Sequence, residues 1–258
     1  MVEPLGDARV LGLPEDVTAC LFDLDGVLTD TAALHAAAWR DMFDGFLRQR
    51  AARDRAAFVA FDPVGDYDTY VDGKPREDGV RCFLRSRGIY LARGDRGDAP
   101  AAETIRGLGE RKNELVLGRM HRDGVRAYEG SVRYVQAVRE AGLRRAVVSS
   151  SMNRCEVLAA AGIEELFEER IDGVVAEREH LAGKPAPDTF VAAGRALGVS
   201  PARCAVFEDA LAGVEAGRGG GFAYVVGVDR AGQAEALRAH GADVVVADLS
   251  ELLHERAS

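Results

Sequence analysis

Lysine is scarce in this chain, and its scarcity draws attention to three positions. Of the 33 basic residues only Lys74, Lys112 and Lys184 are lysines, and arginine supplies all the others. A lysine retained against such a bias is a candidate for a site that needs a compact, mobile ammonium group. Each of the three lies in a segment that other features also mark.

Other features are missing as well, and each absence narrows the class of protein. The four cysteines are scattered without a Cys-x-x-Cys pair, which indicates core thiols in a reducing cytoplasm. No apolar run approaches the roughly 18 residues of a membrane span, and the first residues lack the basic segment of a signal peptide. The net charge of -9 argues against nucleic acid and anionic membranes as partners. We therefore expect a cytoplasmic protein, a monomer or small homo-oligomer, that acts on a small molecule.

An acidic pair follows the first apolar stretch of strand length, residues 17–22. Asp23 and Asp25 come directly after it and are followed by Gly26. Ligands of open α/β sheets collect at the carboxyl ends of strands, and one Mg²⁺ there would reduce the repulsion between the two carboxylates. Asp23 could then attack phosphorus while Asp25 moves the proton. A bare Asp-x-Asp is more often a solvated turn or a helix cap, so the pair needs support from elsewhere in the chain.

Two later strand-like stretches, 145–148 and 204–207, also end in polar residues. A serine run alone most often caps a helix, although its hydroxyls and turn N–H groups can also hold phosphoryl oxygens. A second acidic pair can complete a metal site. The residues at these ends are Ser149, Ser150, Ser151 and Asn153 for the first stretch, and Glu208 and Asp209 for the second.

These strand ends predict one shared site. Lys184 precedes a helix expected at 188–197, where its ammonium could neutralise phosphate charge. The carboxyl ends of parallel strands face the same crevice, so a nucleophile, an acid/base, metal ligands, a hydroxyl and a cation would meet there. Phosphoryl transfer requires these groups. Further strands are predicted near 171–175, 222–228 and 243–247, and further helices at 131–141 and 154–161.

The alternation of strands and helices stops between about 41 and 120, where no strong strand pattern is visible. Helices are predicted there at 41–60, 77–87 and 101–120, after a first helix at 32–40. The fold predicted is a Rossmann-like, doubly wound parallel α/β sheet with an inserted all-helical cap domain. We place the α/β core at 1–32 and 122–258 and the cap at 33–121.

The predicted cap contains three candidate binding features. His35 and Trp39 stand four residues apart on one helix face, although core packing is the ordinary role of a lone Trp and surface exposure that of such a His. Gly73, Lys74 and Arg76 lie in a loop that leads into a helix, which suits an anion or is an ordinary helix start. Lys112 lies in a charged helical segment, and a solvent-exposed charged face is the ordinary explanation for such a segment.

The residues Asp-Leu-Asp-Gly-Val-Leu-Thr-Asp-Thr at 23–31 resemble the first motif of the haloacid dehalogenase-like superfamily, most of whose members are Mg²⁺-dependent phosphotransferases that form a phospho-aspartate. The polar residues at the later strand ends resemble the remaining motifs of that superfamily and follow in the same order. The resemblance implies that Asp23 is the nucleophile and Asp25 the general acid/base, with Ser149 and Lys184 as phosphate ligands. It also implies Mg²⁺ on Asp23, the backbone carbonyl of Asp25, Glu208 and Asp209.

Within the superfamily the chain most resembles the β-phosphoglucomutase family. The residues that carry this likeness, and that it implies bind substrate, are Thr31, His35, Trp39, Gly73, Arg76, Lys112, Ser150, Ser151 and Asn153. The implied reaction interconverts β-D-glucose 1-phosphate and glucose 6-phosphate through β-glucose 1,6-bisphosphate. Two features depart from the family pattern: Met152 stands where relatives often have lysine, and the cap carries extra residues around 44–70 and 91–101. A sugar-phosphate phosphatase with the same core chemistry is the alternative enzyme, and a non-catalytic sugar-phosphate sensor is the alternative outside enzymes.

Overall fold

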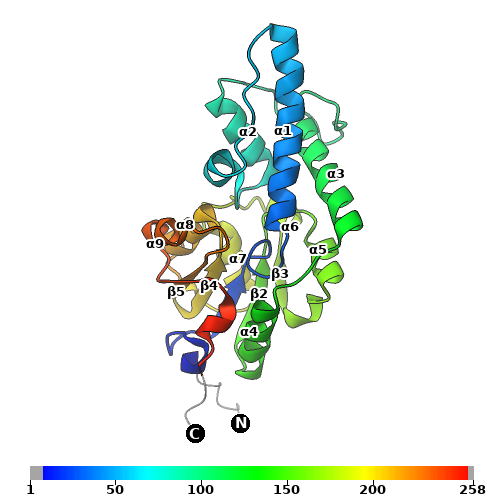
Figure 1. Cartoon of the computed structure of the whole chain (residues 1–258). Helices are drawn as coiled ribbons and strands as arrows, with labels where there is room; N and C mark the ends of the chain where they lie inside the picture. The colour runs from blue at the N-terminus through cyan, green and yellow to red at the C-terminus, as the bar shows by residue number, and fades with distance from the viewer. Residues whose placement is uncertain (1–7, 255–258) are drawn as a thin grey trace. The chain divides into compact units, whose positions relative to one another are not determined.

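The structure, a computed structural model, describes residues 8–254 (Figure 1). The chain divides into two compact units. The core unit is formed by Met1–Asp30 and Val125–Ser258, and the cap unit by Thr31–Gly124. The predicted cap domain, residues 33–121, lies inside the cap unit.

Six parallel strands form the sheet of the core unit, in the order β3-β2-β1-β4-β5-β6. This is the strand order of a doubly wound nucleotide-binding sheet. The prediction of a Rossmann-like α/β core is therefore confirmed. The strands are β1 (Ala19–Phe22), β2 (Arg144–Val148), β3 (Glu169–Ile171), β4 (Cys204–Glu208), β5 (Tyr224–Val228) and β6 (Val244–Val246).

Helices connect the strands of the core unit (Figure 1). Successive side chains of a strand point to opposite faces of the sheet, so each buried strand presents an apolar surface on both sides. The helices are α4 (Glu129–Glu140), α5 (Arg154–Ala161), α6 (Gly173–Glu179), α7 (Asp188–Ala196), α8 (Leu211–Gly219) and α9 (Ala234–His240).

The two faces of the sheet pack against different helices. On one face, Leu21 and Val206 belong to a buried cluster that includes residues of α7 and α8. On the other face, Phe22 stacks on Phe207 with 4.4 Å between the ring centroids. Phe22 also meets Tyr134 of α4 edge to face at 6.3 Å. Burial of an aromatic side chain of this size contributes about 1.5–3 kcal/mol, so these contacts fix β1 firmly at the centre of the sheet.

One predicted strand is wrong in extent. The strand expected at 171–175 ends at Ile171, as β3, and helix α6 begins two residues later. The cause is Asp172, whose side chain accepts a hydrogen bond from the backbone N–H of Val175 at 2.8 Å and so caps the helix. Helices α6, α8 and α9 were not predicted from the sequence.

The cap unit, Thr31–Gly124, is helical and contains no strand, as predicted. Its helices are α1 (Ala32–Asp54), a π-helical turn (Tyr67–Val71), α2 (Arg76–Ser86) and α3 (Ile105–Asp123). Within residues 8–254, none of the helices has the length and apolar character needed to cross a bilayer.

An aromatic cluster holds the cap unit together. The first helix of this unit differs in extent from the prediction. The Phe43 ring lies 4.1 Å from the Phe83 ring and 5.3 Å from the Phe61 ring, measured between centroids. The backbone N–H of Phe61 donates to the buried Asp44 carboxylate at 2.8 Å, which brings the chain back against α1. The helix predicted at 41–60 ends at Asp54, where Arg55 takes a left-handed conformation with a φ of 53°, and it joins the helix predicted at 32–40 without a break.

Candidate active site

The carboxyl ends of β1, β2 and β4 bring the predicted catalytic residues to one edge of the sheet. Strand β1 lies between β2 and β4, and all three are parallel. Asp23 follows β1, Ser149 follows β2, and Glu208 is the last residue of β4. The N–H of Asp23 donates to the carbonyl of Phe207 at 2.9 Å and extends the pairing of β1 with β4 by one residue. The convergence expected from the sequence therefore has a direct structural cause, the common direction of the strands.

Three buried carboxylates lie together at this edge. One oxygen from each of Asp23, Glu208 and Asp209 lies within 4.8 Å of the others. The residues are 7%, 0% and 8% exposed, respectively. An all-oxygen set of donors suits a hard cation such as Mg²⁺ and does not suit a soft metal.

Lys184 is the cation in contact with this carboxylate group. Its ammonium forms an ion pair with Asp23 and lies 2.5 Å from Oε1 of Glu208, and the residue is only 2% exposed. Three carboxylates and one ammonium leave two excess negative charges. Excess charge of one sign is costly in a buried site, and a single divalent cation would balance it. The residues present therefore fit a Mg²⁺ site.

Burial and the neighbouring charges shift the pKa values of Asp23 and Lys184. Burial raises the pKa of Asp23 well above its usual value, and Glu208 and Asp25 add to the shift against the opposing effect of Lys184. Burial alone would lower the pKa of Lys184, but the charges of Asp23 and Glu208 outweigh it and raise the pKa. The lysine is therefore held protonated, and a bound cation would favour the ionised form of Asp23.

Two glycines create the space that the carboxylates occupy. A Cβ atom on Gly26 would lie 1.8 Å from Oδ2 of Asp209, and one on Gly213, in α8, would lie 1.9 Å from the carboxyl carbon of Glu208. Gly26 also has a φ of 89°, a backbone conformation that side chains disfavour. Gly213 was not predicted to have a role, although its position a few residues beyond the second acidic pair was a usable signal.

Asp25 has a different environment from the three buried carboxylates. It is partly exposed, and the hydroxyl of Ser149 donates to its Oδ2 at 3.5 Å. The turn that carries it is closed by two hydrogen bonds, from Gly26 N–H to the Thr29 carbonyl at 2.8 Å and from the Thr29 hydroxyl to the Leu24 carbonyl at 3.1 Å. A carboxylate at the exposed side of such a group can reach a substrate oxygen, which suits a general acid/base.

The serine segment after β2 folds into successive turns. The hydroxyl of Ser149 accepts from the N–H of Ser151 at 3.1 Å, and the hydroxyl of Ser151 accepts from the N–H of Asn153 at 3.1 Å. The next residue, Arg154, forms a buried ion pair with Asp172 at 2.9 Å. Asn153 precedes α5 without a side-chain capping bond. A helix cap was one alternative that the sequence left open for this segment, and Asn153 does not provide it.

Two residues after β5 support the site and were missed by the sequence analysis. Arg230 donates through Nε to the carbonyl of Gly26 at 3.1 Å, and Gln233 donates through Nε2 to the carbonyl of Asp209 at 3.1 Å. Between them, the backbone is held by Asp229, whose Oδ1 accepts from Gln233 N–H at 2.8 Å. Asp229 is one more polar residue at a strand end, and that pattern could have identified the segment.

In the cap unit, three of the predicted binding residues form one cluster. The Nδ1 atom of His35 lies 3.0 Å from the ammonium of Lys112, and that ammonium lies 4.9 Å from the centre of the Trp39 ring. Lys112 is 6% exposed, so it is not part of a solvated face. Trp39 is at the same time a core residue, since its ring stacks on Phe43 at 5.3 Å.

The other predicted cap residues lie at helix starts. Thr31 is buried just before α1, and its carbonyl accepts from the N–H of His35 at 3.0 Å. Gly73 has a φ of 68° in the turn before α2. Arg76 is the first residue of α2, and its guanidinium pairs with Glu110 at 3.0 Å. Lys74 donates to the carbonyl of Thr69 at 2.7 Å.

The fold and the carboxylate group define a class of protein. A model of the haloacid dehalogenase-like hydrolase family matches residues 17–221, a span that contains the predicted residues of the core site. The chain belongs to the haloacid dehalogenase-like superfamily.

Individual relatives narrow the assignment. The chain is 59% identical over 249 residues to a protein named beta-phosphoglucomutase from Mycobacterium tuberculosis, with 95% of each chain covered. It is 31% identical over 241 residues to the beta-phosphoglucomutase of Bacillus subtilis, covering 92% of this chain and 94% of that one. The crystal structure of a beta-phosphoglucomutase from Clostridium difficile matches with a TM-score of 0.70 at 24% identity, over 92% and 93% of the two chains, and supports the fold. Within the superfamily, the chain belongs to the β-phosphoglucomutase family, as its sequence motifs predicted.

Proposed function

We propose that this protein is a β-phosphoglucomutase that interconverts β-D-glucose 1-phosphate and glucose 6-phosphate through a phospho-aspartate at Asp23. The observation that supports this best is that Asp23 touches the buried cation Lys184 and also belongs to the carboxylate group with Glu208 and Asp209. A carboxylate in that position can approach a phosphoryl group whose charge is neutralised by Lys184 and would be neutralised further by a bound Mg²⁺. Membership of the β-phosphoglucomutase family favours a mutase over a hydrolase.

The proposed chemistry uses two carboxylates in two functions. An oxygen of Asp23 attacks phosphorus of the bisphosphate, and the P–O bond to the sugar breaks while Asp25 gives a proton to the departing sugar oxygen. In the return direction, Asp25 takes the proton from a sugar hydroxyl, which attacks phospho-Asp23 and releases the carboxylate. The different exposure of the two residues is consistent with these functions.

The other core residues would bind the transferring phosphoryl group. Lys184 and the hydroxyl of Ser149 would hold its oxygens in place. Mg²⁺, when bound by Asp23, Glu208, Asp209 and the backbone carbonyl of Asp25, would neutralise charge on the phosphoryl group. Ser150, Ser151 and Asn153 would bind the phosphate that does not react.

The cap residues would bind the rest of the substrate. We assign the non-reacting phosphate to Arg76 together with the backbone at Gly73, because a guanidinium and a helix start both favour a phosphate dianion. Thr31, His35, Trp39 and Lys112 would contact the sugar. Binding of the second phosphate would keep water away from the acyl phosphate, since a mutase must transfer to sugar faster than to water.

We also infer that the protein acts in the cytoplasm as a monomer or small homo-oligomer. All four cysteines are free thiols, and Cys20 and Cys204 are buried in the sheet. Burial raises the pKa of Cys204 to about 12, so this thiol is kept in its unreactive protonated form. Free thiols are usual in a reducing compartment.

One assay tests the proposed function against its rivals. The protein is incubated with Mg²⁺, β-glucose 1-phosphate and a trace of β-glucose 1,6-bisphosphate, and both glucose 6-phosphate and free phosphate are followed. Glucose 6-phosphate without free phosphate is the expected result. Free phosphate as the main product would identify a phosphatase instead, and the absence of both products would contradict the proposal.

Two variants test the proposed residues. Asp23→Asn should abolish turnover, because the amide cannot form the phospho-aspartate, and appreciable activity would reject the covalent scheme. Arg76→Ala should reduce mutase turnover far more than hydrolysis of a simple phosphate ester, which carries no second phosphate. Equal losses in both assays would exclude Arg76 as the ligand of the second phosphate.

A further inference from the structure

Arg76 does not lie free on the surface of the cap unit. Its side chain is only 18% exposed, and its Nη2 atom donates to Oε1 of Glu110 in α3 at 3.0 Å. Burial lowers the pKa of this arginine, against the opposing charges of Glu110 and Glu77. For a guanidinium removed from water in this way, a nearby carboxylate offsets the cost of burying the charge and fixes its orientation.

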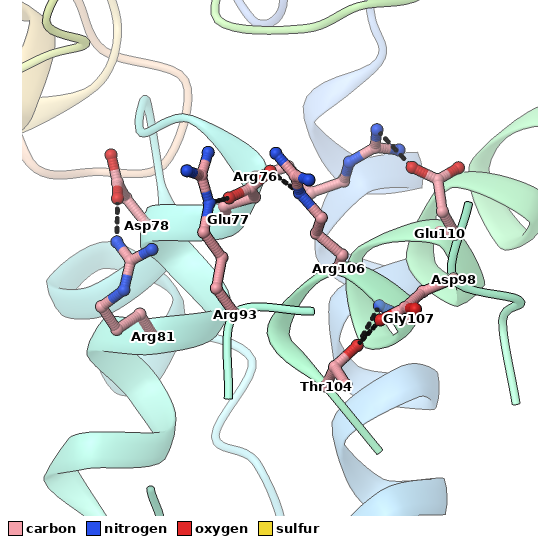
Figure 2. Close-up of polar contacts among 10 residues, drawn as sticks. All are labelled: Arg76, Glu77, Asp78, Arg81, Arg93, Asp98, Thr104, Arg106, Gly107 and Glu110. Atoms are coloured by element: carbon pink, nitrogen blue, oxygen red, sulfur yellow. Dashed lines mark hydrogen bonds and ion pairs between the residues drawn. The ribbon is translucent and has the colours of Figure 1, made fainter. Parts of the chain in front are cut away.

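The helix that carries Arg76 is itself fastened to α3. Glu77, the next residue, accepts from Nε of Arg93 at 2.8 Å and from Nε of Arg106 at 2.9 Å. Figure 2 shows these two arginines converging on Glu77, beside the pair of Arg76 with Glu110. The N–H of Arg106 also donates to the carbonyl of Arg93 at 3.0 Å. Two sets of ion pairs, Arg76 with Glu110 and Glu77 with Arg93 and Arg106, therefore join the first turn of α2 to α3 and to the loop before it.

Helix α3 has the features needed to guide the Arg76 side chain. A Cβ atom on Gly109 would lie 3.5 Å from Cγ of Arg76, which is ordinary contact distance, so the stem of the arginine runs close to the helix surface there. Glu110 then meets the guanidinium at the end of that stem. Lys112, two residues further along, belongs to the cluster with His35 and Trp39.

We propose that Glu110 is a positioning residue that holds the guanidinium of Arg76 in the orientation that binds the non-reacting phosphate of the substrate. This inference rests on the proposed function. An arginine side chain has several rotatable bonds, and fixing them when the phosphate binds would reduce the affinity. The pair with Glu110 fixes the planar guanidinium beforehand through its Nη2 atom, so less conformational freedom is left to lose when the phosphate binds.

The main alternative is that Glu110 weakens the binding of phosphate by Arg76. Its carboxylate is 43% exposed and negatively charged, so it could instead compete with the phosphate for Arg76. The two alternatives predict changes of opposite sign. If Glu110 positions Arg76, then its removal weakens binding of a substrate with two phosphates. If it competes, its removal strengthens that binding.

The test compares Glu110→Ala and Glu110→Gln with Glu114→Gln. Glu114 lies one turn further along α3 and is exposed, so its change removes the same charge from the same helix. KM for β-glucose 1,6-bisphosphate and kcat are measured in the mutase assay, and hydrolysis of p-nitrophenyl phosphate is measured separately. For Glu110→Ala we expect KM to rise about tenfold, in line with the loss of one charge-assisted hydrogen bond. Its hydrolysis of p-nitrophenyl phosphate should stay within about twofold of the parent, because this compound has no second phosphate for Arg76 to bind.

Glu110→Gln keeps an oxygen that can accept from Nη2 of Arg76, so it should recover most of the lost affinity. Glu114→Gln should match the parent protein. A KM that falls in Glu110→Ala, or that is unchanged, would overturn the proposal. An equal loss in the mutase and hydrolysis assays would also overturn it, because it would indicate general damage to the fold.

A double variant separates this inference from the proposed function. If Glu110 acts through Arg76, adding Glu110→Ala to Arg76→Ala should cause no further loss of mutase activity. A further loss in the double variant would show that Glu110 acts by another route. If Arg76→Ala alone leaves mutase turnover intact, the proposed phosphate ligand is wrong. If Arg76→Ala impairs turnover and Glu110→Ala does not, only the positioning inference fails.

Discussion

At the scale of single residues, the candidate site depends on side chains that are absent as much as on those present. Gly26 and Gly213 stand where any Cβ atom would collide with Asp209 or Glu208. At these two positions a carboxylate lies where a Cβ atom would be, so only glycine fits without a shift. The acidic residues supply the charge, and the glycines determine where that charge can lie.

Gly213→Ala should therefore impair the site without harming the helix. The new Cβ would lie 1.9 Å from the carboxyl carbon of Glu208, so that carboxylate must move. Alanine favours a helix over glycine by about 1 kcal/mol, so α8 itself should not be weakened. We expect turnover to fall by about 100-fold, the effect of a misplacement of roughly 1 Å, with a higher requirement for Mg²⁺.

Gly219→Ala in the same helix is the matched control, since a Cβ atom there would meet nothing within 4 Å. Mutase rates of both variants measured over a range of Mg²⁺ concentrations provide the comparison. Parent-like activity in Gly213→Ala would mean that Glu208 can shift without consequence, and its assignment as a metal ligand would be lost.

At the scale of elements, the first turn of α2 is held by ion pairs that acid should release. Burial of Glu77 alone would raise its pKa, but the hydrogen bonds and charges of Arg93 and Arg106 outweigh burial and lower it. A carboxyl group with a lowered pKa in the folded state stabilises the protein above its unfolded pKa of about 4.3. That stabilisation is lost as the pH falls through the lower folded value.

The difference in unfolding free energy between the parent and Glu77→Gln should depend on pH in the same direction. It should be constant from pH 7 down to about 5 and should shrink toward zero below about 4. Urea unfolding followed by circular dichroism at several pH values measures it. A difference that stays the same at the lowest pH where both proteins fold would show that the charge of Glu77 is not responsible.

Site residues that follow a strand were predictable from the sequence, whereas contacts between distant segments were not. Asp23, Ser149 and Glu208 were predictable because each follows an apolar run, and parallel strands bring such ends together. The pair of Arg76 with Glu110 was not predictable, since 34 residues separate them and only the packing of α2 on α3 joins them. The end of α1 at Asp54 was not predictable either, because Arg55 ends the helix in a left-handed conformation that residues other than glycine rarely adopt. The binding functions assigned to the cap residues remain predictions.

At the scale of the whole molecule, each of the two units has its own apolar core. The sheet cluster contains residues of the core unit, and the aromatic cluster around Phe43 contains residues of the cap unit. The three carboxylates and Lys184 all belong to the core unit. A ligand of these carboxylates should therefore act first on the stability of that unit, because a ligand that binds only the folded form stabilises it.

Mg²⁺ should raise the thermal unfolding temperature of the protein, and Asp209→Asn should remove that response. A ligand at about 100 times its Kd adds ~2.7 kcal/mol, which corresponds to roughly 5–10 °C for a chain of this size. Without Mg²⁺, Asp209→Asn should be at least as stable as the parent, because it removes one of the excess charges among the buried carboxylates. Calorimetry of both proteins with EDTA and with Mg²⁺ measures the four temperatures. A variant that is less stable in EDTA would indicate a structural function for Asp209, and an undiminished Mg²⁺ response would place the cation elsewhere.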